Sequence, residues 1–231
     1  SDALPICTIT ALRRPFLLKV KKMDLQIALL LGQDGIVNGA IYALLALALV
    51  PVFAVTRVIF IPQGEFVAYG ALTLAAFQAG KTPGTLWILL GAGVLVALID
   101  TVMAVRAGSL GRLKRIALWD LALPAAIAGL VLFLEPGKLP LWVQVGLALA
   151  IVIPLGPLIY RLAYQPLAEA SVLVLLIVSV AVHLTLVGLG LLFFGAEGSR
   201  TTPFSEAQFN LGMLTVNGQT LWVLGASGVL I

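Results

Sequence analysis

Long stretches without a charged residue dominate this chain of 231 residues. They cover residues 35–56, 66–80, 82–99, 121–134, 139–160 and 170–196. An apolar helix of about 20 residues crosses a hydrocarbon core of roughly 30 Å, and most of these stretches approach that length once a charge at either boundary is allowed to snorkel. The sequence therefore predicts an all-α, polytopic transmembrane helical bundle with six or seven helices.

Composition supports a lipid environment. Hydrophobic residues make up 61% of the chain and charged residues 10%, whereas soluble domains carry about 25% charged residues. So few charges cannot cover the surface of a water-soluble domain, and this class is excluded. The net charge of +4 lies in short Lys and Arg clusters between the apolar stretches, which is typical of membrane orientation and does not indicate a nucleic-acid partner.

The short loops predict how the chain is oriented. Basic residues place the loops 106–116 and 161–169 in the cytoplasm, because Lys and Arg concentrate on that side of membrane proteins. Segments 135–138 and 197–219 then face outside. The side of the N-terminus stays open, because residues 25–80 could cross the membrane two or three times.

Both ends of the sequence suggest a fragment. Residues 1–22 are basic and contain two prolines, so we interpret them as an N-terminal tail or an upstream extension. Residues 23–231 then form the transmembrane domain. Its last apolar run begins at Leu221 and reaches only Ile231, which predicts truncation at the C-terminus.

One polar interruption separates the first two apolar stretches. It contains Arg57, Pro62, Gln63, Gly64 and Glu65. Proline lacks a backbone donor and glycine is conformationally free, so we expect a helix broken near residues 60–64 and a half-helix that restarts at about Gln63. Such breaks often line transport sites. An ordinary short cytoplasmic loop is the alternative.

Several motifs follow one another along the chain. GIVNGAIYALLALA begins at Gly35 and is followed by VIFIPQGEFVAYGALT at 58–73, by YRLAYQPL at 160–167, and by an apolar run from Leu173 into Phe194 and Gly195 with Gly198 to Arg200 beyond it. In this order they resemble the permease subunits of branched-chain amino acid ABC importers. Departures from the family pattern include Phe60 where Asn is usual, Gln63 where His is usual, Pro51 inside the first helix, and an added basic loop and helix at 106–138.

The resemblance implies a function and a set of partners. Such a permease imports branched-chain or related amino acids across the bacterial inner membrane by alternating access. It works with a second permease subunit, two ATP-binding subunits and a periplasmic substrate-binding protein. ATP hydrolysis belongs to the partners, in keeping with the lack of a phosphate-binding loop motif in this sequence, so we do not expect an enzyme.

Other functions stay open at the level of sequence. A permease of the same family for urea or short amides fits the departures at Phe60 and Gln63. A channel or scaffold subunit without coupled transport, or an intramembrane enzyme, would come from other classes. With one histidine and one cysteine in the chain, we expect no metal site, and we expect no cofactor.

The candidate substrate path combines the interruption with polar residues of one helix before it and one helix after it. If a half-helix starts near Gln63 and Gly64, its free amides could receive a substrate carboxylate while Glu65 meets the ammonium group. Glu65 could instead only offset the dipole of its own helix. Further polar candidates lie at mid-helix positions, where they could line the path or simply join helices: Asn38, Tyr42, Ser179 and His183.

Two acidic residues, Asp100 and Asp120, are expected to stabilise the structure and to play no part in transport. Asp100 and Asp120 flank the basic loop, and we expect them to pair with Arg106, Lys114 or Arg115 at the membrane interface.

Overall fold

The computed structural model describes residues 7–106, 117–205, 207–211 and 214–231. The chain forms two compact units. The first combines Ser1–Ala48 with Pro203–Ile231, and the second is Leu49–Thr202. The boundary predicted after residue 22 falls inside a long helix and stays a prediction.

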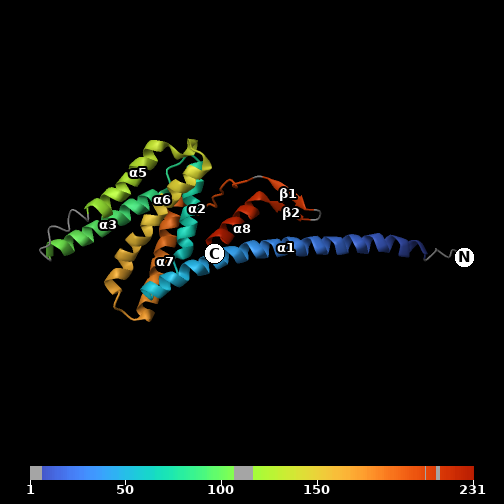
Figure 1. Cartoon of the computed structure of the whole chain (residues 1–231), viewed down its shortest axis with the longest axis horizontal. Coiled ribbons are helices and arrows are strands. Elements are labelled where there is room, and N and C mark those ends of the chain that lie inside the picture. The colour runs from blue at the N-terminus through green and yellow to red at the C-terminus, as the bar shows by residue number, and fades with distance from the viewer. Residues whose placement is uncertain (1–6, 107–116, 206, 212–213) are drawn as a thin grey trace. The chain divides into compact units, whose positions relative to one another are not determined.

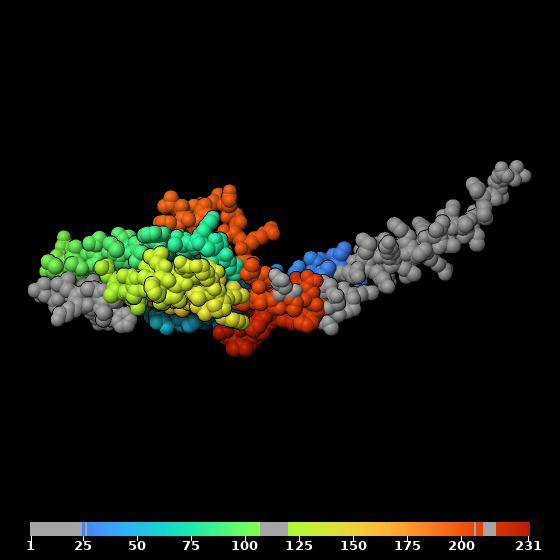
Figure 2. Space-filling view, turned by 90° about the horizontal axis from the view of Figure 1, so that it is seen from above, coloured from blue at the N-terminus to red at the C-terminus, as the bar shows by residue number. Residues whose placement is uncertain are grey.

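The second unit is a helical bundle, as predicted (Figure 1). Helices α2, α3 and α5 pack against α6, α7 packs against α2 and α3, and α3 and α5 lie side by side (Figure 2). After the end of α1 (Cys7–Thr56), its elements are α2 (Gln63–Gln78), α3 (Gly84–Arg106), the π-helical turn η1 (Ala117–Ala122), α5 (Leu123–Leu134), the 3-10 turn η2 (Pro136–Lys138), α6 (Leu141–Ile159), the π-helical turn η3 (Tyr160–Tyr164), the 3-10 turn η4 (Gln165–Leu167) and α7 (Val172–Phe194).

The described residues include four helices long and apolar enough to span a membrane. They are Ile27–Thr56, Gly84–Arg106, Leu141–Leu167 and Val172–Phe194. Their outward faces remain apolar, since Leu98, Met103 and Leu192 are 59%, 61% and 75% exposed. Continuous apolar faces of this kind need a partner other than water. The chain is therefore a membrane-embedded protein.

The core of the second unit lies where α6 meets α3 and α2. Ile151 and Leu155 of α6 are fully buried, and Leu89 of α3 is buried with them. Close approach at the edge of this core requires small residues, as is common between membrane helices. A Cβ on Gly93 of α3 would lie only 2.6 Å from the backbone oxygen of Asp120.

The predicted helix break is confirmed, with a correction to its position and cause. Residues 57–62 are non-helical, and α2 begins at Gln63 as expected. The left-handed residue is Arg57, with φ 56°. Gly64 lies inside α2 with open space around it, so glycine freedom does not cause the break. Pro62 precedes α2 instead and can start a helix but not continue one.

The first unit contains a β-hairpin that the sequence analysis did not predict. Strands β1 (Gln208–Leu211) and β2 (Leu214–Asn217) pair antiparallel, from Gln208 opposite Asn217 to Leu211 opposite Leu214. Helix α8 (Gly218–Leu230) follows directly. Two strands of four residues are too short to stand out from the polar segment 197–219 that contains them, and the fold remains predominantly helical.

Candidate functional site

The broken backbone before α2 is held by a side chain from α7. The Ile61 N–H donates to Ser179 Oγ over 3.0 Å, and the Tyr164 hydroxyl donates to the same oxygen over 3.1 Å. Ser179 is fully buried. Non-helical backbone within a membrane needs such a partner, because lipid offers none. Ser179, a predicted path residue, therefore stabilises the break.

One helical turn further along, an acid faces a base. Glu65 Oε1 lies 2.8 Å from His183 Nδ1, and their side chains are 16% and 35% exposed. The two atoms lack the alignment of a hydrogen bond, and within the described residues the buried Glu65 Oε2 has no hydrogen-bond partner. An unsatisfied buried carboxylate oxygen is costly in free energy. This oxygen can accept a hydrogen bond from a bound cationic group.

These contacts form a regular series between α2 and α7. The Tyr69 hydroxyl donates to the Leu186 carbonyl over 2.6 Å, one turn beyond the pair of Glu65 and His183. Residue numbers rise together along both helices, so α2 and α7 run side by side in the same direction (Figure 1).

The series also gives the depth of the break along α7. His183 lies about eleven residues after Val172, or roughly 16 Å along the axis, which is near the middle of α7. Helix α2 has 16 residues, or about 24 Å, less than a core of roughly 30 Å. The position of His183 near the middle of α7 and the short length of α2 both favour a half-helix that starts within the membrane over an ordinary loop at the membrane surface.

The start of α2 exposes backbone donors next to this acid. Pro62 supplies no capping side chain, and its carbonyl accepts the N–H groups of Glu65 and Phe66 over 3.1 and 3.4 Å. The first amides of a helix have no partner within the helix and carry partial positive charge. Gln63 and Gly64 supply these amides, with Glu65 in the same first turn. The arrangement therefore offers donors for an anion and an acceptor for a cation within one turn.

Aromatic rings surround the break. The ring centroid of Phe60 lies 5.6 Å from that of Phe66 and 5.9 Å from that of Tyr164. Tyr164 stacks in turn on Tyr160 at 6.2 Å. Phe60, a departure from the family pattern, is thus part of an apolar wall and not a polar contact.

Two predicted path residues belong to the other unit. Asn38 and Tyr42 lie one turn apart on α1 and are both exposed. They are part of Ser1–Ala48, so their role in a path stays a prediction.

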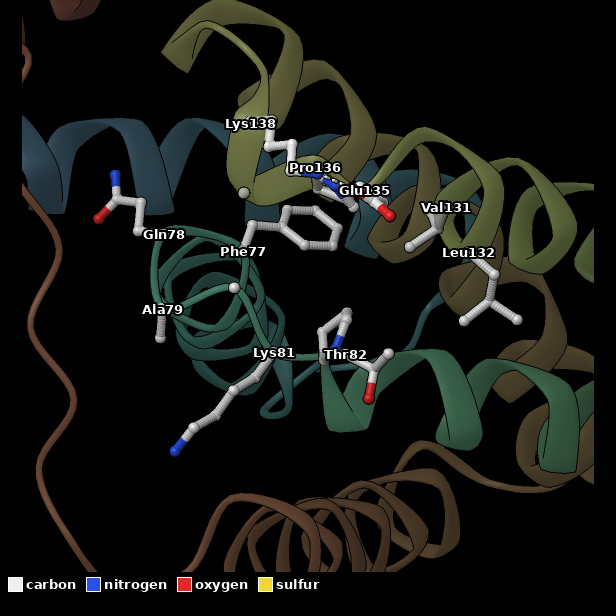
Figure 3. Close-up of a pocket in the computed structure, with 13 residues that line it drawn as sticks. Phe77, Gln78, Ala79, Lys81, Thr82, Val131, Leu132, Glu135, Pro136 and Lys138 are labelled. Atoms are coloured by element: carbon white, nitrogen blue, oxygen red, sulfur yellow. Dashed lines mark ion pairs between the residues drawn. The ribbon is translucent and has the colours of Figure 1, made fainter.

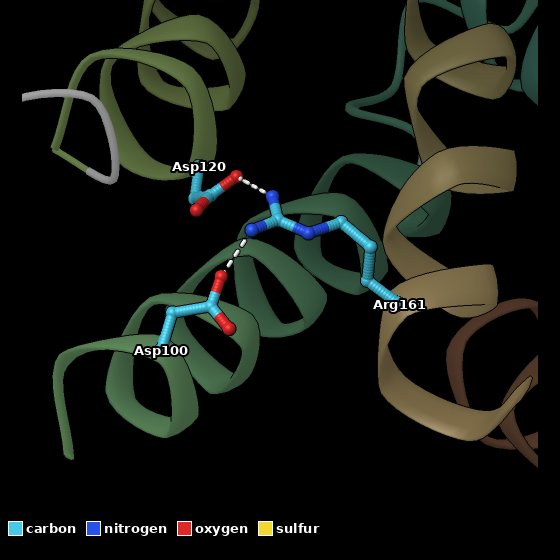
Figure 4. Close-up of polar contacts among 3 residues, drawn as sticks. All are labelled: Asp100, Asp120 and Arg161. Carbon is cyan, nitrogen blue, oxygen red and sulfur yellow. Dashed lines mark hydrogen bonds and ion pairs between the residues drawn. The ribbon is translucent and has the colours of Figure 1, made fainter. Parts of the chain in front are cut away.

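A second ionic cluster lies at the ends of three helices (Figure 4). Arg161 binds the carboxylates of both Asp100 and Asp120. The sequence analysis did not predict this partner, and no ion pair with Arg106 forms among the described residues. The expected partners Lys114 and Arg115 lie outside the described residues, so that part of the expectation stays a prediction. The true partner follows α6 and is distant in sequence, and only packing of α6 on α3 reveals it. The cluster ties α3, η1 and η3 together.

Comparisons with protein-family models, curated proteins and solved structures find no match to this chain.

Proposed function

We propose that this chain is the membrane-spanning permease subunit of an ABC importer that takes up branched-chain or related amino acids by alternating access. The observation that carries the proposal is the pair of Glu65 and His183 beside the uncapped start of α2. An ionisable pair at mid-helix depth is costly in a membrane and is a mark of solute pathways.

An amino acid matches the two ends of this arrangement. Its carboxylate meets the first-turn amides at Gln63 and Gly64, and its ammonium group meets the unpartnered oxygen of Glu65. His183 of α7 lies against the other carboxylate oxygen of Glu65. The aromatic wall at Phe60 suits an apolar side chain, which favours a branched-chain substrate over urea or a short amide.

The motif resemblance supports the rest of the proposal. Under it, the protein lies in the bacterial inner membrane with a second permease subunit and receives substrate from a periplasmic binding protein. Two ATP-binding subunits drive the cycle, and this chain hydrolyses no ATP itself.

Replacing Glu65 tests the proposal directly. Glu65→Gln keeps the shape but removes the charge that meets the ammonium group. Hydrogen bonds to charged groups contribute about 1.5–3 kcal/mol, so uptake of radiolabelled leucine by the assembled transporter should fall by roughly tenfold or more. Membrane abundance, measured by immunoblot, should stay at the parent level.

Glu135→Gln is the matched control, because Glu135 is an exposed acid at a helix end. It should leave leucine uptake unchanged. Full leucine uptake by Glu65→Gln would remove Glu65 from the site. Leucine flux that persists without ATP or the ATP-binding subunits would favour a channel instead.

A further inference from the structure

Two hollows flank the turn between α2 and α3, at the end of the bundle that the sequence predicts to face outside. One, of about 560 Å³, lies between this turn and the end of α5 (Figure 3). The other, of about 400 Å³, lies between the turn and the end of α7. Lys81 and Thr82 line both hollows.

The two hollows differ in charge. In the first, Glu135 and Lys138 form an ion pair, and Lys81 extends away from Glu135 and Leu132 (Figure 3). The second is lined by Lys81 and Arg200, with no acidic side chain among its described lining residues. Neither cation makes an ion pair within the part of the chain that the structure describes. The second hollow therefore concentrates positive charge.

The lining of the second hollow combines apolar and polar residues. Leu72 and Ala75 of α2 and Phe194 of α7 are apolar, and Thr82 and Ser199, the sequence neighbours of the two cations, carry hydroxyls. A free inorganic anion gains nothing from the apolar lining residues. A molecule that joins an anionic group to acyl chains matches both parts, and cationic side chains near a membrane surface attract anionic lipid.

We propose that this hollow, framed by Lys81 and Arg200, is a binding site for an anionic phospholipid of the outer leaflet. The phosphate lies between the two cations, the hydroxyls of Thr82 and Ser199 bind its oxygens, and an acyl chain contacts the apolar lining residues of α2 and α7. This site is separate from the proposed substrate site and does not depend on the transport function.

Counting bound lipid tests the proposal. The full chain is purified in detergent with equal amounts of phosphatidylglycerol and phosphatidylcholine, and native mass spectrometry measures the lipid retained. The parent should retain phosphatidylglycerol preferentially. A cation near the surface contributes about fivefold in lipid affinity, so the double variant Lys81→Gln/Arg200→Gln should lose about 25-fold.

Two further variants separate the site from general effects. Lys81→Arg/Arg200→Lys keeps both charges and should retain the parent preference for phosphatidylglycerol. Glu135→Gln/Lys138→Gln alters the other hollow without changing net charge and should also match the parent.

Three results would overturn the proposal. One is equal retention of the two lipids by the parent. Another is parent-like retention of phosphatidylglycerol by the double Gln variant. The third is displacement of the lipid by millimolar inorganic phosphate, which would mean a site for free anions.

Discussion

Two clusters of ionisable side chains in the same helical unit have different designs. Arg161 is shared by Asp100 and Asp120 and joins three elements away from any break in the helices. Glu65 and His183 form a single contact near the middle of α7, beside broken backbone. Each cluster leaves one buried carboxylate oxygen without a hydrogen-bond partner in the described structure, Asp120 Oδ2 and Glu65 Oε2, so position and number of partners distinguish the two.

The difference separates a structural role from a functional one. A charge network at helix ends fixes packing, and its loss should reduce stability. A single pair beside the uncapped start of α2 is poorly explained by stability, because a buried pair often contributes little against its desolvation cost. We therefore expect variants of the Arg161 cluster to unfold more easily, and variants at Glu65 to keep their fold but lose transport.

Removing Arg161 should have the largest effect on stability. Arg161→Leu leaves two carboxylates facing each other, with Asp120 almost fully buried. Breaking a buried pair on one side costs about 3–5 kcal/mol, and the partial exposure of Arg161 and Asp100 favours the lower end of that range. Thermal unfolding of the purified chain in detergent measures the loss. Restored stability in Arg161→Leu/Asp100→Asn/Asp120→Asn would confirm that the uncompensated charge is the cause. An unchanged unfolding transition in Arg161→Leu would show that Arg161 does not stabilise the packing of these elements.

Adding a methyl group at the close contact between α3 and η1 should have the next largest effect. Gly93→Ala places a Cβ 2.6 Å from the backbone oxygen of Asp120, so α3 and η1 must move apart. Overpacking of this kind costs about 1–3 kcal/mol. Gly91→Ala, on the same helix with open space around it, is the control and should be neutral or slightly stabilising. Equal unfolding temperatures for the two variants would show that α3 and η1 are not in close contact.

Loss of the hydroxyl that holds the break should have a smaller effect. Ser179→Ala leaves the Ile61 N–H without its acceptor, which costs about 1–2 kcal/mol for a partly buried group. Thr185→Ala is the matched control, because the Thr185 hydroxyl bonds only to the Ala181 carbonyl of its own helix. Hydrogen exchange at residues 57–62 should rise in Ser179→Ala and not in Thr185→Ala. Unchanged exchange in both would mean that Ser179 does not hold the break.

The exposed pair at the outer end should have the smallest effect. The hydrogen bond from Lys138, followed by its charge, lowers the pKa of Glu135 below the ordinary value. A lowered pKa means that the contribution is present above the ordinary pKa and is lost as the pH falls through the lowered one. Glu135→Gln should therefore leave the unfolding temperature unchanged at neutral pH, since fully exposed pairs contribute little. A clear loss of stability would show that this pair is not merely a surface contact.

Most of the fold could be predicted because hydrophobicity in a membrane maps directly onto helices. The stretch 170–196 anticipated α7, and the interruption before Glu65 anticipated the start of α2 at Gln63. The hairpin at 208–217 could not be predicted, since two short strands carry little periodic signal.

The candidate site could be predicted in residue types but not in partners. The polar interruption singled out Glu65, polar positions within the stretch 170–196 singled out Ser179 and His183, and the structure places all three along one helix pair. The expectation that the conformational freedom of Gly64 breaks the helix was wrong, because Gly64 lies inside α2, whereas its amide in the substrate path stays a prediction. The pairing of Asp100 and Asp120 with Arg161 depends on packing between segments far apart in sequence, which no local pattern contains.

The contacts between α2 and α7 have a mechanical consequence. Three contacts at successive turns, from Ile61 just before α2 and from Glu65 and Tyr69 within it, resist sliding and rotation of α2 against α7. Under the proposed transport cycle, the two helices therefore move together as one rigid body, and the conformational change falls where this body meets its neighbours. A disulfide engineered between α2 and α7 would then leave uptake intact, whereas a disulfide from either helix to a neighbour that moves against it would block uptake.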